Sequence, residues 1–203
     1  MPVKTVAIIG SGIAGLVSAK HAVENNLLPF VFEKSKSIGG LWSLDSSYIW
    51  EGMIANASIY RQMFSDHSWP ANANVFPTSL EINNYLLSYV ERFALDQYIY
   101  LNTQVVSVEK FESKKWLIKS VDLEKLIATS EIFDFVVVAS GEHAVPRIPN
   151  IANAELFKGI QMHSSEFKLN DVSLKSKIVV VVNFVMLLCQ TAYFLEDIFS
   201  KIY

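Results

Sequence analysis

A chain of 203 residues of which 51% are hydrophobic is long enough and apolar enough to form a packed globular domain. Its formal net charge of −3, without a basic cluster, argues against a nucleic-acid partner. The single cysteine, Cys189, excludes an internal disulfide and fits a reducing compartment.

An apolar strand followed at once by a glycine turn is the first strong pattern in the chain. Val6–Ile9 is a short apolar run typical of a buried parallel strand, and residues 10–15 continue it as GSGIAG. In a GxGxxG turn, Gly10 permits the tight turn, Gly12 lets a pyrophosphate approach the backbone, and Gly15 allows the next helix to pack closely. The pyrophosphate would lie at the N-terminus of that helix.

The following helix and strand complete a βαβ pattern. The helix has a predicted apolar side of Leu16, Ala19 and Val23, and a polar side of Lys20 and Glu24. It ends at Asn25-Asn26, before a second apolar strand at 30–32. Glu33 stands at the tip of that strand, where a carboxylate can accept hydrogen bonds from both hydroxyls of an adenosine ribose, which favours FAD or NAD over NADP. The alternative is an exposed strand-end glutamate beside a structural glycine turn.

A second glycine element, GGLW at 39–42, can bring the backbone close to an extended ligand. The Leu-Trp pair would then line one side of the site along a long dinucleotide. The alternative is a glycine loop with a core tryptophan. Residues 43–77 form an irregular, aromatic-rich stretch that we interpret as a functional loop. A capping box at 78–81 then starts an amphipathic helix that extends to about Leu95. Its apolar face comprises Ile82, Tyr85, Leu86, Tyr89, Val90 and Phe93.

The second half of the chain is rich in predicted strands. Short strands at 98–101, 104–109, 115–121 and 126–132 are expected as a small antiparallel excursion with a turn near 113–114. Residues 133–141 form a buried strand that ends in a small-residue turn and pairs beside the first strand. Residues 177–182 resemble the opening strand, as though a second nucleotide-binding unit began there.

These motifs together resemble the N-terminal part of a flavin-containing monooxygenase, over roughly residues 3–182. The matching stretches are the GxGxxG turn, EKS at 33–35, GGLW at 39–42, FSD at 64–66, VASG at 138–141 and, most specifically, FKGIQMHSSEF at 157–167. The last fits the family motif FxGxxxHxxx(F/Y). A Baeyer–Villiger enzyme would be expected to carry Trp where this chain has Phe167.

The resemblance implies an α/β fold in which a Rossmann-like domain holds FAD and a second site holds NADPH. Reduced flavin would capture O₂ as a C4a-hydroperoxide and transfer one oxygen atom to a soft nitrogen or sulfur atom of a small-molecule substrate. The residues that it places near FAD are Gly10, Ser11, Gly12, Ile13, Ala14, Gly15, Glu33, Lys34, Gly40, Leu41, Trp42, Asn56, Val105, Ser140 and Gly141. Asn56 is the candidate catalytic residue beside the flavin ring; alternatively it caps a turn. His163 is expected to position the second domain.

The resemblance weakens after Val182, where the family has a second GxGxxG turn. This chain has Asn183, Val185 and Leu188 at the three glycine positions, so NADPH is not expected to bind there in the usual way. We expect an FAD-binding domain at 1–170 and an incomplete, degenerate start of an NADP-binding domain at 171–203, with weak or no turnover from this polypeptide alone.

Several alternatives remain open. Residues 178–195 carry no charge and could form a membrane anchor, a disrupted strand-helix remnant, or an artefact of reading frame or splicing. A pyridine-nucleotide disulfide reductase would need a redox cysteine pair, which Cys189 alone does not supply. The non-enzymatic alternative is a flavin-binding remnant without activity. It would be anchored to a membrane or would associate with a full-length relative, for example through its unfinished sheet edge. The expected location is the cytoplasm or the cytoplasmic face of an internal membrane.

Overall fold

The computed structural model describes residues 2–46, 48–50, 52–142, 145–166, 177–180 and 201–202. The chain divides into two compact units. Unit 1 comprises Met1–Ser46 and Leu80–Pro146, and unit 2 comprises Ser47–Ser79 and Arg147–Tyr203. The boundary predicted at residue 170 lies outside the described residues.

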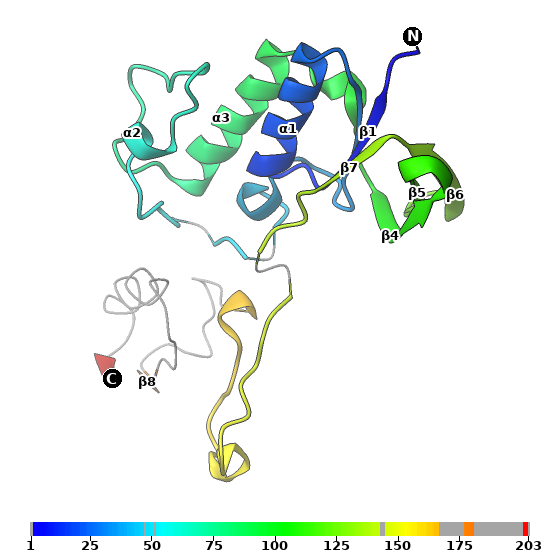
Figure 1. Ribbon diagram of the computed structural model, residues 1–203. Coiled ribbons are helices and arrows are strands. Elements are labelled where there is room, and N and C mark those ends of the chain that lie inside the picture. Colours follow the sequence, from blue (N-terminus) through cyan, green and yellow to red (C-terminus); the bar gives the residue numbers. More distant parts are fainter. Residues whose placement is uncertain are drawn as a thin grey trace. The chain divides into compact units, whose positions relative to one another are not determined.

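Unit 1 is built on a parallel sheet of four strands in the order β3-β2-β1-β7, of which β1 and β7 are labelled in Figure 1. The strands are β1 (Thr5–Ile9), β2 (Leu28–Phe32), β3 (Ile99–Tyr100) and β7 (Phe135–Val138). Ile9 is in register with both Phe32 and Val138, so the carboxyl ends of the three strands are level. In open parallel sheets, ligands bind outside this edge.

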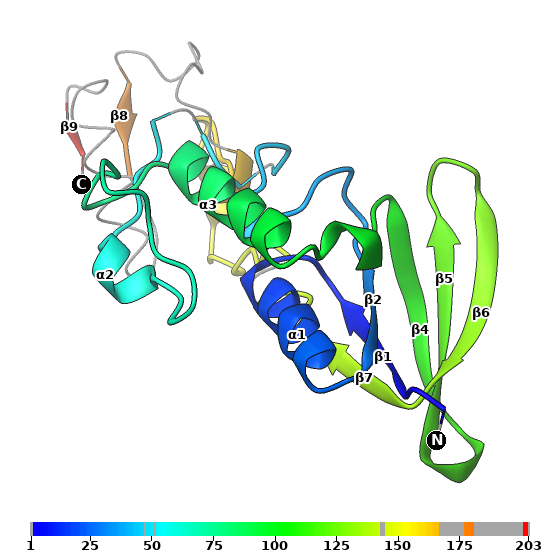
Figure 2. The same ribbon diagram turned by 90° about the horizontal axis from the view of Figure 1, so that it is seen from above.

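Helix α1 (Ile13–Glu24) connects β1 to β2 and packs on one face of the sheet (Figure 2). Leu16 and Ala19 are fully buried as predicted, but the two sides of the helix are not divided as expected. Val23 is exposed, whereas Lys20 is 7% exposed, with its ammonium 2.7 Å from Glu24 and above the Phe93 ring. An aromatic face and a carboxylate together stabilise a lysine at low exposure.

Helix α3 (Ser79–Arg92) lies beside α1 (Figure 1) and confirms the predicted amphipathic helix. Five residues of its predicted apolar face are buried: Ile82, Tyr85, Leu86, Tyr89 and Val90. The helix precedes β3, which pairs parallel with β2. The prediction that 98–101 belongs to the antiparallel excursion is therefore wrong, because a crossover helix returns the chain to the same sheet as a parallel neighbour.

The opposite face of the parallel sheet packs against an antiparallel sheet in the order β4-β5-β6. Its strands are β4 (Thr103–Phe111), β5 (Lys115–Asp122) and β6 (Ile127–Phe133). The shared core contains Ala7, Phe32, Ile118 and Phe133, with the Phe133 ring edge-on to Phe30 at 5.2 Å between centroids. These two sheets confirm the predicted α/β class, with a parallel sheet plus an antiparallel excursion.

The short 3₁₀ helices of unit 1 are Gly40–Trp42, Asp96–Tyr98 and Glu112–Lys114. Among its described residues, unit 2 contains α2 (Ile59–Gln62) and the 3₁₀ helices Ala154–Leu156 and Ser164–Glu166. Its strands β8 (Ile178–Val179) and β9 (Lys201–Ile202) pair parallel. Across the part of the chain that the structure describes, no helix has the length and apolar character needed to span a membrane. Most of the segment 178–195 lies outside that part.

Candidate functional site

The glycine turn begins at the carboxyl end of β1. Gly10 has a φ of +104°, which side-chain-bearing residues rarely adopt, and its N–H donates to the Phe32 carbonyl at 2.8 Å. A Cβ at Gly10 would lie 2.4 Å from the Ala139 carbonyl oxygen. Gly10 is therefore required by the fold, because a side chain there would prevent the close approach of the chain segments at the ends of β1, β2 and β7.

Gly15 is also required by the fold. A Cβ there would lie 1.9 Å from the Gly10 carbonyl oxygen, far inside van der Waals contact. The first turn of α1 can approach the glycine turn this closely only without a side chain at Gly15, which is the role predicted for the third glycine.

Gly12 differs from the other two glycines because the fold itself does not need it. Its φ of −71° and ψ of −176° are extended backbone that any residue adopts. A Cβ at Gly12 would meet only the Gly40 Cα, at an ordinary 3.6 Å. The missing side chain thus leaves a cradle between the glycine turn and the second glycine element.

The N-terminus of α1 opens onto this cradle. Its N-cap is Gly12, no side chain caps it, and its first turn contains no acidic residue. Ile13 and Ala14 are both exposed. Among the described residues no side chain caps the N–H groups of this first turn, which suits a phosphate.

Glu33 lies at the carboxyl end of β2 and is 6% exposed. Its Oε2 accepts hydrogen bonds from both the N–H and the hydroxyl of Ser11, at 2.8 and 2.9 Å. Its Oε1 accepts the Ser35 N–H at 2.8 Å. The carboxylate is therefore attached to the glycine turn, and the alternative of an exposed strand-end glutamate is wrong.

The second glycine element is held beside the turn by backbone and amide bonds. The Gly39 N–H donates to the Ser11 carbonyl at 3.1 Å, and the buried Asn83 amide of α3 donates to the Trp42 carbonyl at 3.1 Å. A Cβ at Gly40 would lie 2.9 Å from the Gly12 Cα, so the two glycines face each other. Leu41 is exposed and Trp42 half-buried.

Hydroxyls and a carboxylate close the loop after the second glycine element. The Ser37 hydroxyl lies 2.6 Å from that of Ser43 and donates to Asp45 at 2.7 Å. The bond from Ser37 and the ammonium of Lys36 hold the pKa of Asp45 below its ordinary value. Asp45 therefore stays ionised, and continues to anchor this loop, down to acidic pH.

The remaining predicted residues of unit 1 lie near the same edge or at its margin. The Ala139 N–H donates to the Ile9 carbonyl at 2.9 Å, which places Ser140 beside Gly10. Gly141 has a φ of +89°, and a Cβ added there would meet no atom within 4 Å, so the strand end turns in open space. Val105 is half-buried at a β-bulge, and Lys34 is exposed.

Asn56, the candidate catalytic residue, belongs to unit 2 and is exposed. His163 of the identity motif also belongs to unit 2, where its N–H donates to Glu166 and its Nδ1 accepts the Ser165 N–H at 3.2 Å. The described bonds of His163 thus form a local cap on a short helix. The roles predicted for both residues remain predictions.

Comparison with known proteins agrees with the geometry of unit 1. The family model described as flavin-binding monooxygenase-like matches residues 3–194. The chain belongs to this family. It is 33% identical over 191 residues to dimethylaniline monooxygenase (N-oxide-forming) 2 of Oryctolagus cuniculus, covering 88% of the chain and 35% of the relative. It is 34% identical over 194 residues to flavin-containing monooxygenase 5 of Rattus norvegicus, covering 90% and 36%.

Solved structures share the fold of this flavin-binding monooxygenase-like chain. S-allyl-L-cysteine S-oxygenase from Allium sativum superposes with a TM-score of 0.89 at 23% identity, over 99% of this chain and 50% of that one. Tmm from a Pelagibacter strain gives a TM-score of 0.77 at 26% identity, over 89% and 46%. The chain spans about a third of the length of the curated relatives that it matches.

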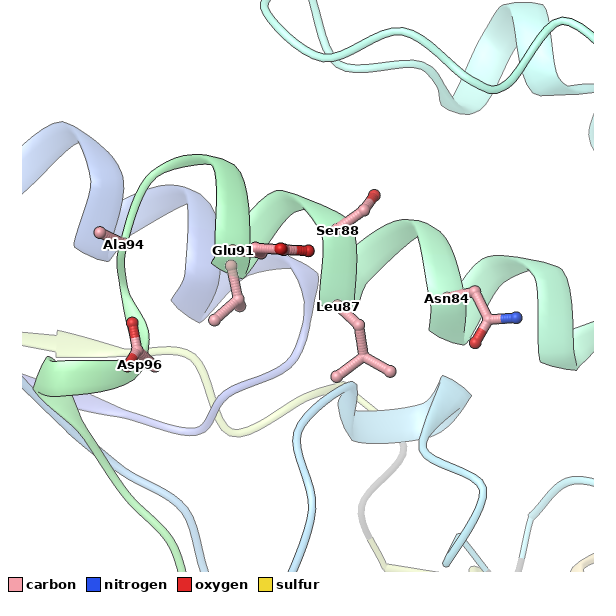
Figure 3. A pocket seen from close by; sticks show the side chains of 7 residues that line it. Asn84, Leu87, Ser88, Glu91, Ala94 and Asp96 are labelled. Carbon is pink, nitrogen blue, oxygen red and sulfur yellow. The ribbon is translucent and has the colours of Figure 1, made fainter.

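The flavin-binding monooxygenase-like chain also has a hollow of about 540 Å³ on the outer side of α3 (Figure 3). Its lining includes Asn84, Leu87, Glu91 and Asp96, and none of the residues predicted to bind a cofactor. The cofactor cradle and this hollow are therefore separate features of unit 1.

Sequence reasoning missed Asn83 as a part of this family member's site. Asn83 is 5% exposed and supports the loop that carries Gly40. The signal was present, because Asn83 lies at helical spacing from the buried Leu86 and Val90 and is polar on an otherwise apolar face. A polar residue at such a position requires a hydrogen-bond partner.

Proposed function

We propose that this chain binds FAD at the cradle of unit 1, as the flavin-binding part of a monooxygenase. The observation that carries the proposal is the free space at Gly12, where the fold tolerates a side chain that the sequence lacks. A pyrophosphate that lies against Gly12 explains why this position is glycine, whereas Gly40 is already required by its φ of +59° and its close approach to Gly12. Family membership supports flavin as the ligand.

Different residues of unit 1 would bind different parts of the cofactor. The N–H groups at the start of α1 would bind the pyrophosphate, and Glu33 would accept a hydrogen bond from the adenosine ribose. The loop tied down by Asn83 would keep Gly40 at its short distance from Gly12. Bound flavin would supply the activation of O₂, with electrons from NADPH.

For the whole protein we propose oxygenation of a small molecule at a soft nitrogen or sulfur atom. The activities named for two similar proteins support this class: one is an N-oxide-forming dimethylaniline monooxygenase and the other an S-oxygenase of S-allyl-L-cysteine. Asn56 is our candidate for contact with the flavin ring, because its amide can donate and accept hydrogen bonds at once.

One observation favours a second candidate, a flavin-binding protein without catalytic activity. The sequence after Val182 carries Asn183, Val185 and Leu188 where the family has its second glycine turn. Side chains at these positions would occupy the space of a second pyrophosphate. The chain would then hold FAD without being reduced by NADPH.

Purified protein distinguishes these two functions. We expect a flavin absorbance band that persists through gel filtration, or that is restored by incubation with FAD. Folded protein that stays colourless with excess FAD would contradict both functions. Bleaching of the bound flavin by NADPH under anaerobic conditions would support the monooxygenase, whereas a flavin that stays oxidised with NADPH but bleaches with dithionite would support the non-catalytic protein.

A further inference from the structure

The hydroxyl of Ser11 bonds directly to the carboxylate that is expected to bind the adenosine ribose. Ser11 is fully buried, and its Oγ donates to Glu33 Oε2 at 2.9 Å. Its backbone is used as well, since the N–H donates to the same oxygen at 2.8 Å and the carbonyl accepts the Gly39 N–H at 3.1 Å. Ser11 thus joins the glycine turn, the tip of β2 and the second glycine element.

The GxGxxG pattern does not demand a serine at this position. Any residue at position 11 can make the two backbone bonds, so only the hydroxyl depends on residue type. The hydroxyl therefore adds a bond that the turn does not need, inside a site whose other parts the turn explains.

The described hydrogen bonds leave Glu33 little free capacity. An ionised carboxylate offers about four acceptor positions, two on each oxygen. Oε2 already receives the N–H and the hydroxyl of Ser11, and Oε1 receives the Ser35 N–H. One position remains, on Oε1, whereas an adenosine ribose presents two hydroxyls.

We infer that the Ser11 hydroxyl restricts Glu33 to one ribose hydroxyl, which makes Ser11 a specificity-determining residue for the adenosine half of the cofactor. This inference rests on the proposed binding of FAD. Without the hydroxyl, each carboxylate oxygen keeps a single N–H donor, so the Glu33 carboxylate can turn and offer one acceptor position to each ribose hydroxyl. The sequence expectation that Glu33 accepts both hydroxyls would then hold for a Ser11→Ala chain and not for the natural one.

The test compares FAD with its 2′-deoxyadenosine and 3′-deoxyadenosine analogues, titrated into the full chain by quenching of flavin fluorescence. In the natural chain, one analogue should bind about 10- to 100-fold more weakly than FAD, because a hydrogen bond to a charged group is lost. The other should bind within about threefold of FAD, since a lost hydroxyl without a protein partner changes little. Both analogues should lose at least about tenfold in Ser11→Ala.

Two further variants keep the test decisive. Ser11→Cys retains a side chain of similar size with only a weak donor, so it should behave as Ser11→Ala if that variant folds poorly. Ser18→Ala is the matched control, because its hydroxyl donates to the Ala14 carbonyl within the same helix at 2.7 Å. Ser18→Ala should reproduce the pattern of the natural chain.

The outcomes separate this inference from the proposed function. A natural chain that binds FAD but loses affinity equally for both analogues would overturn the role of Ser11. An unchanged pattern in Ser11→Ala and Ser11→Cys would overturn it as well. A natural chain that is folded by circular dichroism and binds none of the three flavins would contradict the proposed function and, with it, this inference.

Discussion

Replacing Gly12 with alanine separates the needs of the fold from those of the ligand. A Cβ at this position would meet only the Gly40 Cα, at 3.6 Å, and the backbone there is extended. The unliganded chain should therefore accept alanine without strain. Alanine reduces the freedom of the unfolded chain by about 0.4–1 kcal/mol, but it is a poorer N-cap than glycine by a similar amount, so we expect Gly12→Ala to leave the free energy of unfolding nearly unchanged.

The same methyl group should weaken FAD binding. It would occupy the cradle in which we place the pyrophosphate, and an extra methyl in a filled site costs about 1–3 kcal/mol. That cost corresponds to a loss of FAD affinity of about 5- to 150-fold. Affinity for the cofactor should thus fall while the stability of the apo chain stays nearly unchanged.

Gly15→Ala is the matched comparison. Its Cβ would lie 1.9 Å from the Gly10 carbonyl oxygen, so the backbone must shift and the melting temperature should fall in the apo chain. The assay is thermal unfolding by circular dichroism without flavin, followed by FAD titration. The reasoning is refuted if Gly12→Ala destabilises the apo chain as much as Gly15→Ala, or if Gly12→Ala binds FAD as tightly as the natural chain.

Three other changes test the remaining parts. Phe133→Ala removes a core ring that is 2% exposed, so the free energy of unfolding should fall by about 3–5 kcal/mol in chemical denaturation; a loss below about 1 kcal/mol would contradict the packing of the two sheets. The Thr5 N–H, which donates to Asp134 at 2.9 Å, and the nearby Lys115 hold the pKa of Asp134 below its ordinary value. A lowered pKa stabilises the fold above the unfolded-state pKa and loses that contribution as pH falls, so Asp134→Asn should flatten the decline of melting temperature below about pH 4; an identical pH dependence would contradict this. Asn56→Ala should leave FAD bound and lower oxygenation, measured as product formed per NADPH consumed in a chain that turns over; equal product yields would remove Asn56 from the chemistry.

Local sequence was sufficient for the features that depend on neighbours along the chain. An apolar run followed by the glycine turn specifies a strand, a tight turn and a helix, because Gly10 adopts a positive φ and Gly15 leaves room for the Gly10 carbonyl five residues earlier. Helical spacing likewise predicted the buried face of α3. The family motif at 157–167 was recognised in the same way.

Contacts between distant segments could not be obtained in this manner. Lys20 is buried because Phe93, just past the end of α3, covers its ammonium, and helical periodicity alone assigned it to the polar side. The pairing of β3 with β2 depends on where the α3 crossover returns the chain. Whether a glycine serves the fold or a ligand, and how many donors already surround Glu33, are set by atoms that come together only when the sheet edge assembles. Sequence patterns specify which groups are present, and tertiary packing decides which of their bonding positions remain free.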